Sequence, residues 1–494
     1  MSILIWRYSH FLLALISSLF LIIASVTGGI LALEPISESI QPYNVTSINN
    51  ISLNQTILAL RKNYDEIIEI EVTDNDFVIA SVIKEDSQLK KIYIDPVSGE
   101  SIGNVKKQNP FFAFVTNLHR SLFLKTIGRY FVGLVSLLLC LIAVTGFFLL
   151  AKRQGGFYNF FNKIQDKNLN QKFHVLFGKW LIIPIIIIST TGVFLSLEKL
   201  SFIPKNYLNY KWINKEKKSI QNQSTSSFFE TIYLDEVRTL SFPFSKSEED
   251  YFEVNLKDRK LLVDQFSGEV TKESYYPFIK LATRWNLILH TGKGNILWSI
   301  ILFIASSSIL FFMYTGFSIS LKRLLRGKKT KEILKANECE YIILVGSETG
   351  NTFTFANIFF ESLVKAGKNV FISPLNNYKK YNKAKNIIVF TSTYGNGEAP
   401  SNAVLFKEKF KKVTHVNEIN FSVLGFGSLA YPKFCQFAID VYEIFNSNVK
   451  FKSIMPLHKI NEQSNNSFLE WTKVWSKVNS IDLRIEINNS EKEI

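Results

Sequence analysis

Four apolar segments constrain this chain of 494 residues more than any other feature. They cover about 11–33, 127–150, 175–197 and 296–321. A helix needs about 20 apolar residues to cross the roughly 30 Å hydrocarbon core of a bilayer. The first segment is too long for the core of a signal peptide and lacks a small-residue cleavage pattern, so we expect it to remain as a helix. The sequence therefore predicts a multi-pass membrane protein.

Basic residues set the expected orientation of these spans. They gather before the first span, between the second and third, and after the fourth, and short flanks rich in Lys and Arg stay in the cytoplasm. They are Arg7, Lys152, Arg153, Lys163, Lys167, Lys172, Lys322, Arg323, Arg326, Lys328 and Lys329. We therefore expect cytoplasmic termini and two segments outside, 34–118 and 198–289. No nucleic-acid motif accompanies the net charge of +15, so we expect no nucleic-acid partner.

The first 325 residues contain an internal repeat: two similar halves, offset by about 164–171 residues. The segment "YSHFLLALISSLFLIIASVTGGILALEP" matches "KFHVLFGKWLIIPIIIISTTGVFLSLEK", and "YIDPVSGE" matches "LVDQFSGE". Each half reads as helix, outside domain, helix. Two such units in the same orientation predict a pseudo-twofold axis along the membrane normal, with four helices forming one bundle.

Four of the six histidines, His10, His119, His174 and His290, occupy duplicated positions at the ends of the spans. His10 and His174 belong to the cytoplasmic side and the other two to the outer side, which gives one pair per membrane face. A single imidazole there is commonly an amphipathic side chain at headgroup level, but imidazole is also the usual axial ligand of haem iron. The three cysteines form no C-x-x-C-H motif and are too few for a disulfide framework. The repetition therefore predicts two non-covalent haem b groups.

These halves resemble the PepSY-associated transmembrane family of iron-regulated bacterial membrane proteins. The resemblance covers about 1–325 and rests on the paired "H…TG" helices and the "DPxSGE"-like hairpins, although the second hairpin, "VDQFSGE", lacks the proline. It implies two α+β PepSY-like domains in the periplasm and a location in the bacterial inner membrane. It also implies a siderophore-reductase-like activity, with a ferric siderophore or ferric chelate as the periplasmic acceptor.

From Glu340 onward the pattern changes to short apolar runs that alternate with helical spacing. The runs are "EYIILVG", "NVFISPL", "KNIIVFTST", "FSVLGFG" and "VKFKSIMPL". Strands that alternate with helices predict a doubly wound parallel sheet, in which ligands bind beyond the carboxyl ends of the strands. The sequence therefore predicts an α/β domain whose site lies in three loops.

The three loops have the composition of a site for a phosphorylated, flat ligand. The first, "SETGNT" (347–352), places hydroxyls and backbone N–H groups at a helix N-terminus, which suits a phosphate monoester, and it contains no G-K-[ST]. The loops "TSTYGNGEAPSNA" (391–403) and "GFGSLAYPKFC" (425–435) each offer glycines for close backbone approach and one tyrosine. Two aromatic rings can sandwich a flat ring system.

Over about 340–478 these loops look like the flavodoxin-type FMN domain of the cytochrome P450 reductase and sulfite reductase flavoprotein group. The resemblance implies FMN, held by Ser347, Glu348, Thr349, Gly350, Asn351 and Thr352 at the phosphate and by Ser392, Thr393, Tyr394, Gly395, Asn396, Gly397, Gly425, Gly427, Ser428, Tyr431, Phe434 and Cys435 around the ring. In this sequence Ser428 stands where the group usually has Asn, and Asn461 stands where an acidic residue is common. A flavodoxin fold with an empty site is the alternative.

The group normally continues into a reductase module that binds FAD and NADPH, and about sixteen residues follow the domain here. We therefore expect a separate cytoplasmic FAD/NAD(P)H reductase as the electron donor. The expected activity is an oxidoreductase that passes electrons from FMN through two haem b groups to the periplasmic acceptor. No single catalytic residue is predicted.

The expected domain layout follows from these patterns, and two alternatives remain for the function. The layout is 1–33, 34–118 (PepSY-like), 119–150, 151–174, 175–197, 198–289 (PepSY-like), 290–321, 322–339 (basic linker), 340–480 (flavodoxin-like) and 481–494 (tail). In one alternative the outside domains bind or regulate other proteins, and the flavodoxin domain is a redox sensor. In the other, the same electron path ends at a different acceptor, such as a periplasmic quinone or disulfide system.

Overall fold

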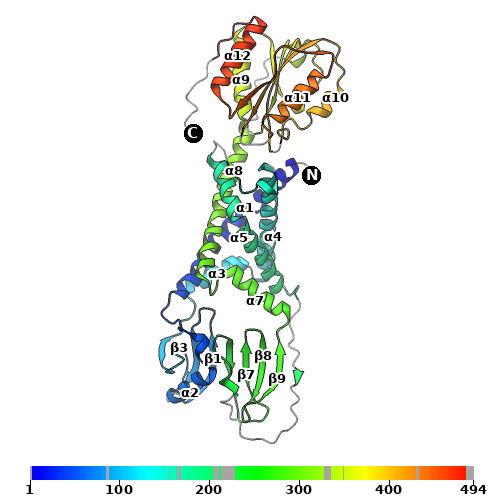
Figure 1. Ribbon diagram of the computed structural model, residues 1–494. Helices are drawn as coiled ribbons and strands as arrows, with labels where there is room; N and C mark the ends of the chain where they lie inside the picture. The colour runs from blue at the N-terminus through cyan, green and yellow to red at the C-terminus, as the bar shows by residue number, and fades with distance from the viewer. Residues whose placement is uncertain are drawn as a thin grey trace. The chain divides into compact units, whose positions relative to one another are not determined.

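The computed structural model describes residues 3–84, 88–154, 156–162, 164, 169–203, 211–212, 228–326, 335–348, 350–395, 397–429 and 433–485. The predicted site residues Thr349, Asn396 and Tyr431 lie outside this set. The chain forms two compact units, drawn in Figure 1. Unit 1 comprises Met1–Leu12, Val144–Trp180 and Phe312–Ile494, and unit 2 comprises Leu13–Ala143 and Leu181–Phe311.

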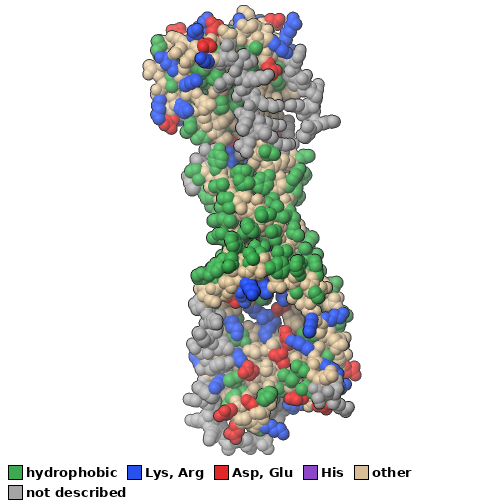
Figure 2. All heavy atoms as spheres, turned by 180° about the vertical axis from the view of Figure 1, so that it is seen from behind, with side chains coloured by type: hydrophobic (Ala, Val, Ile, Leu, Met, Phe, Trp, Pro, Cys, Tyr) green, Lys and Arg blue, Asp and Glu red, His purple; other side chains and the backbone are tan. Residues whose placement is uncertain are grey.

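Four helices in the described part of the chain are long and apolar enough to cross a membrane. They are α1 (Ile3–Ser39), α4 (Lys125–Arg153), α5 (Leu169–Lys199) and α8 (Ile296–Arg326). Large apolar side chains remain exposed on them, such as Leu15, Ile16 and Leu19 of α1, and Figure 2 shows hydrophobic side chains gathered over the long helices. Such a surface suits lipid rather than water. The prediction of a multi-pass membrane protein is therefore confirmed.

Two shorter helices, α3 (Pro110–Ser121) and α7 (Phe278–Thr291), precede the second and fourth long helices. The expected layout assigned 119–150 and 290–321 to the second and fourth spans, and in the structure each range begins in a short helix and continues in a long one. The breaks occur where the backbone is left-handed, at Leu122 with φ 49° and at Gly292 with φ 80°. His119 and His290 therefore belong to α3 and α7.

The segments predicted to lie outside the membrane contribute to one nine-stranded sheet rather than to two separate ones. Its order is β4-β3-β2-β1-β6-β7-β8-β9-β5, with antiparallel pairing that includes Ile70 opposite Leu240. The strands are β1 (Glu66–Val72), β2 (Val78–Ile83), β3 (Leu89–Ile94), β4 (Ser101–Asn104), β5 (Lys211–Trp212), β6 (Val237–Ser241), β7 (Tyr251–Leu256), β8 (Arg259–Asp264) and β9 (Val270–Tyr275). Helix α2 (Leu53–Asn63) packs on the shared core.

The C-terminal domain is a six-stranded parallel sheet of order β11-β10-β12-β13-β14, with β15 paired to β13. This is the flavodoxin-like order, which confirms the predicted doubly wound sheet. The strands are β10 (Tyr341–Gly346), β11 (Val370–Pro374), β12 (Asn386–Ser392), β13 (Ile419–Gly427), β14 (Phe451–Ser453) and β15 (His458–Asn461). The helices are α9 (Asn351–Lys365), α10 (Phe406–Lys412), α11 (Gln436–Asn446) and α12 (Asn465–Asn479). Short 3-10 turns lie at Ile48–Asn50, Phe157–Asn159, Ala336–Glu338 and Leu375–Asn377.

Both faces of this sheet are buried, because successive side chains of a strand point to opposite faces. In β10, Ile342 and Leu344 join one apolar core, which includes Phe445 of α11. The intervening Ile343 joins the other core, which includes Trp471 of α12. Helices on both faces leave the carboxyl ends of the strands open for the loops of the site.

Candidate functional site

Three loops at the carboxyl ends of β10, β12 and β13 form the candidate flavin site. The strands are neighbours: Gly346 pairs with Thr391, and Thr391 pairs with Gly425. Parallel pairing brings the three ends to one edge of the sheet. The described residues of the predicted FMN set therefore lie in loops that meet, as the sequence indicated.

The first loop is a backbone cradle at the start of α9. Gly350 has φ 87° and caps the helix, and its N–H donates to Ser347 Oγ over 3.0 Å. The Ser347 N–H donates to Asn402 Oδ1 over 2.7 Å, so Asn402 fixes the loop from the neighbouring segment. A helix N-terminus with this left-handed entry presents N–H groups to an anion. Sequence reasoning missed Asn402, although it quoted the loop that contains it.

The second loop is a tight turn built around two glycines. Tyr394 and Glu398 exchange backbone hydrogen bonds of 2.9 and 2.8 Å. Gly395 and Gly397 have φ of 54° and 88°, a conformation that other residues adopt only with strain. The turn holds the Tyr394 ring at the predicted flavin-binding edge.

Ser392 and Thr393 join this turn to its neighbours. Ser392 Oγ donates to the Gly346 carbonyl over 3.3 Å. The Thr393 N–H donates to the Phe426 carbonyl over 3.0 Å, and Thr393 Oγ1 accepts from the Phe437 N–H over 3.1 Å. Both side chains therefore bond to protein partners and position the loop.

The third loop packs tightly on the start of α11. A Cβ atom added at Gly427 would lie 3.0 Å from both N and Sγ of Cys435, so only glycine fits there without a shift. The Leu429 N–H donates to Asn461 Oδ1 over 3.0 Å, and Phe434 packs partly buried against the core. The Cys435 side chain is fully buried. The structure therefore places Cys435 beneath the loop, where it supports Gly427, and not on the surface that a ring would contact.

Burial raises the pKa of the Cys435 thiol to about 12. The thiol therefore stays protonated at every pH well below that value, and the thiolate is the form that reacts. We expect iodoacetamide to leave Cys435 unmodified in the folded protein at both pH 7 and pH 9, and to modify it after unfolding. Peptide mass spectrometry measures this, and modification of the folded protein would contradict the buried placement.

All four candidate haem-ligand histidines make the same contact with a Thr-Gly pair. The ring Nδ1 lies within hydrogen-bond distance of the Thr Oγ1, and a Cβ atom added at the glycine would lie 3.1–3.5 Å from the ring Cε1. The Nδ1 to Oγ1 distances are 2.9 Å for His10 and Thr145, 2.8 Å for His119 and Thr27, 2.8 Å for His174 and Thr315, and 3.0 Å for His290 and Thr191. His10, His174 and their threonines belong to unit 1, whereas His119, His290 and their threonines belong to unit 2.

The threonine hydroxyls determine which ring nitrogen carries the proton. Thr27 Oγ1 donates its single proton to the Ile23 carbonyl over 2.6 Å, and Thr191 Oγ1 does the same to Ile187 over 2.6 Å. Each hydroxyl must then accept from the histidine, so Nδ1 is the protonated nitrogen. Nε2 keeps its lone pair, as in a metal-binding histidine whose other nitrogen donates to a protein acceptor.

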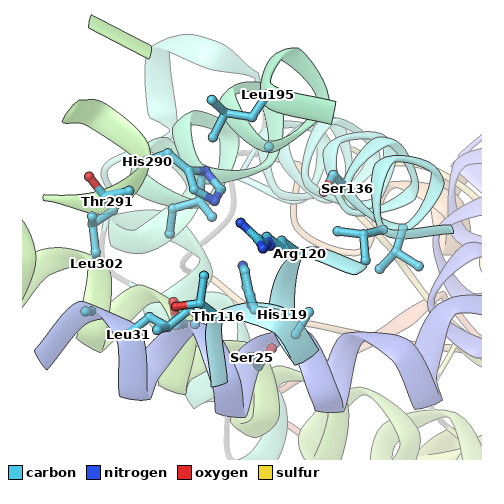
Figure 3. A pocket seen from close by; sticks show the side chains of 18 of the residues that line it. Ser25, Leu31, Thr116, His119, Arg120, Ser136, Leu195, His290, Thr291 and Leu302 are labelled. Carbon is cyan, nitrogen blue, oxygen red and sulfur yellow. The ribbon is translucent and has the colours of Figure 1, made fainter. Parts of the chain in front are cut away.

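His119 and His290 face one cavity of about 410 Å³ within unit 2. Their ring centroids lie 6.3 Å apart, and Figure 3 shows both rings and the Arg120 side chain pointing toward the middle of the cavity. Apolar residues such as Leu195 and Leu302 line much of the wall. Among the described residues no group of three or more His, Cys, Asp or Glu side chains gathers as a metal site. His119 and His290 are thus the side chains in this cavity whose imidazole nitrogens could bind a ligand.

The fold defines a class of protein in which apolar membrane helices carry a flavodoxin-like domain. The family model described as "PepSY-associated TM region" matches residues 7–323, so the chain belongs to that family. The family model described as "Flavodoxin" matches residues 343–471. The chain therefore joins a flavodoxin-type electron-transfer domain, which supports FMN as the cofactor, to a PepSY transmembrane region.

Curated relatives of the flavodoxin part include sulfite reductase flavoproteins and a nitric oxide synthase. The sulfite reductase [NADPH] flavoprotein alpha-component of Neisseria meningitidis serogroup B is 38% identical over 98 residues, 19% of this chain and 16% of that protein. That of Bacillus subtilis is 34% identical over 101 residues, 20% of this chain and 17% of that protein. The inducible nitric oxide synthase of Carassius auratus is 32% identical over 132 residues, 24% of this chain and 77% of that sequence. The chain thus spans about a sixth of the length of these sulfite reductase relatives.

A solved structure titled as a flavodoxin of Streptococcus pneumonia TIGR4 is 24% identical and has a TM-score of 0.26. It aligns over 28% of this chain and 97% of its own.

Proposed function

We propose that this protein moves electrons across the bacterial inner membrane. FMN would sit in the three loops of the flavodoxin domain, and two haem b groups would sit between His10 and His174 and between His119 and His290. The single observation that carries the proposal is the fourfold His–Thr arrangement, in which the ring Nδ1 of each histidine lies within hydrogen-bond distance of a threonine Oγ1.

The geometry of the second pair fits a haem iron. If one nitrogen of each ring held an iron at about 2 Å, as in other metal–imidazole bonds, the two ring centroids would lie roughly 6 Å apart. The centroids of His119 and His290 are 6.3 Å apart, in a largely apolar cavity that also receives the Arg120 guanidinium. Arg120 can pair with a haem carboxylate.

The loops of the flavodoxin domain fit FMN. The left-handed Gly350 begins α9, whose N-terminus would receive the phosphate, and Gly395 and Gly397 shape the turn whose Tyr394 would face the flavin ring. Bound FMN supplies the exchange between two-electron and one-electron chemistry, and haem supplies one-electron transfer. The protein positions the groups: Asn402 and Ser347 fix the phosphate loop, and the four threonines hold the imidazoles.

We further propose the orientation and the partners of this path. The basic flanks favour cytoplasmic termini, which puts the flavodoxin domain inside and the nine-stranded sheet, as joined PepSY-like domains, in the periplasm. The donor is an FAD/NAD(P)H-dependent reductase, in keeping with the word NADPH in the names of the sulfite reductase relatives. The acceptor is a ferric siderophore or another ferric chelate.

A reduced-minus-oxidised visible spectrum of membranes that contain the protein tests the proposal. We expect a b-type haem signal together with flavin, and purified protein without iron would overturn it. Growth on a ferric siderophore as sole iron source separates this acceptor from a quinone or disulfide acceptor. If the domain is instead a redox sensor attached to a binding protein, function will survive the loss of all four histidines.

The threonines offer a finer test of the haem sites. Thr27→Val removes the acceptor of the His119 Nδ1–H but keeps the side-chain shape, and loss of such a partner typically weakens metal binding by roughly 10–100-fold. We expect Thr27→Val to lower the haem content of the His119 and His290 site, and Thr27→Ser to keep it. Haem titration followed by absorbance measures both variants. Equal affinities for Val and Ser would show that the hydroxyl is not needed.

A further inference from the structure

Arg7 of α1 contacts two of the three candidate flavin loops. Its Nη1 forms an ion pair with Glu348 Oε1 of the first loop. Its guanidinium also lies over the Tyr394 ring of the second loop, 4.8 Å from the ring centroid. Glu348 is held in place from the other side, because its Oε2 accepts from the Ser401 N–H over 2.8 Å. One side chain of a membrane helix thus bridges two loops of the α/β domain.

The contact is mostly shielded from water. The exposed fractions of the Arg7 and Glu348 side chains are 15% and 8%. Salt screens a partly buried pair less than an exposed one, and removal of one partner leaves a poorly solvated charge. In addition, Arg7 Nη2 is buried without a hydrogen-bond partner among the described residues.

A second membrane helix, α4, approaches the second flavin loop. The Lys152 carbonyl, in the last turn of α4, lies 3.4 Å from the position that a Cβ atom on Gly395 would take. Gly395 thus permits close contact between the second flavin loop and the end of α4. The two contacts, by Arg7 and by Lys152, lie within the same compact unit.

Arg7 is also close to a candidate haem ligand along its own helix. Residues three apart on a helix lie on the same face, roughly 5–6 Å apart at Cβ, and Arg7 and His10 have this spacing. The side chain that stacks on Tyr394 therefore stands about one turn from the imidazole of His10.

We propose that Arg7 docks the flavin loops on the ends of the membrane helices and so fixes the route between the flavin site and the His10 site. This inference rests on the proposed function for its electron-transfer consequence, but the docking itself requires neither cofactor. Glu348 and Tyr394 are the surface that Arg7 recognises, through one ion pair and one cation–π contact.

Photo-crosslinking of the full-length chain tests the docking directly. The photoreactive residue p-benzoylphenylalanine, placed at position 394, is expected to crosslink to the α1 peptide that contains Arg7. We expect Arg7→Gln to reduce this crosslink several-fold. The double variant Arg7→Glu with Glu348→Arg restores the pair with reversed charges but loses the acceptor of the Ser401 N–H, so it should recover part of the crosslink. Lys172→Gln, an equal loss of charge on α5, is the matched control and should leave it unchanged.

The rate of haem reduction after photoreduction of the flavin provides the second measurement. We expect Arg7→Gln to slow it about tenfold or more, with the FMN and haem contents of the protein retained, and the charge-reversed pair to restore part of the rate. A wild-type crosslink in Arg7→Gln, or no recovery in the charge-reversed pair, would overturn the inference. A chain that binds no haem would overturn the proposed function alone, because the crosslink remains measurable.

Discussion

The proposed haem ligation predicts that replacing His119 with alanine removes one of two haems and leaves the FMN in place. His119 and His290 face one cavity, and the proposal assigns one nitrogen of each ring to an iron held between them. We expect the pyridine haemochrome assay to show haem per protein falling by about half, because the alanine side chain supplies no nitrogen to that iron. The absorbance of bound flavin measures the FMN that remains.

A histidine outside the candidate sites provides the control for this result. His458 belongs to β15 of the flavodoxin sheet, and its Nε2 lies 3.1 Å from Ser467 Oγ. His458→Ala is expected to keep both haems. Full haem content in His119→Ala would contradict the assigned ligand, and an equal loss in both variants would show that the assay reports general damage.

Gly350→Ala is expected to weaken FMN binding strongly. Gly350 has φ 87° and caps α9, and its N–H donates to Ser347 Oγ, which fixes the candidate phosphate loop. A Cβ atom there strains the left-handed backbone by about 1–2 kcal/mol, and any relief moves the N–H groups away from the phosphate. Loss of one hydrogen bond to a charged group would raise the FMN dissociation constant on the order of tenfold or more. Fluorescence titration of the flavin measures it.

Gly367 is a matched control for the backbone strain, because it follows the other end of the same helix. Its φ is 73°, and a Cβ atom added there meets no atom within 4 Å. We expect Gly367→Ala to reduce the free energy of unfolding of the domain by about 1 kcal/mol, as strain alone predicts, and to leave the FMN affinity unchanged. Equal affinity losses in both variants would show that Gly350 acts only through stability.

The flavodoxin sheet is the part of the fold that the sequence predicts well. Its central strands are short apolar runs buried on both faces, as Ile342, Ile343 and Leu344 of β10 show, so length and composition identify them. The helices between them follow from their spacing. The three loops could be predicted once the strands were identified, because loops that follow neighbouring parallel strands meet at one edge of the sheet.

The joined sheet could not be predicted in this way. β1 and β6 pair through backbone groups near Ile70 and Leu240, and backbone pairing leaves no mark on the order of side chains. Both strands have one buried face, and the sequence pattern of such a strand is the same whether it lies at the edge of a sheet or in its middle. The repeat predicted two equivalent segments, and only the structure shows that they share one core.

The histidines were predicted from their repetition, but their partners were not. The sequence shows His10 and Thr27 at a fixed spacing in one helix, where 17 residues span about 25 Å and contact is impossible. The structure pairs Thr27 with His119 instead, 92 residues away. Arg7 was read as a flanking charge for the same reason, since its partner Glu348 lies 341 residues further along.

The β1 and β6 pairing makes each half of the chain the partner of the other. The two strands hold corresponding places in the two halves and run antiparallel, and β2 to β4 continue on one side as β7 to β9 do on the other. Identical strands that meet in this way form the self-complementary contact of a twofold homodimer. One half alone would leave its β1 edge open to other strands, so joining both halves in one chain keeps that edge covered at any protein concentration.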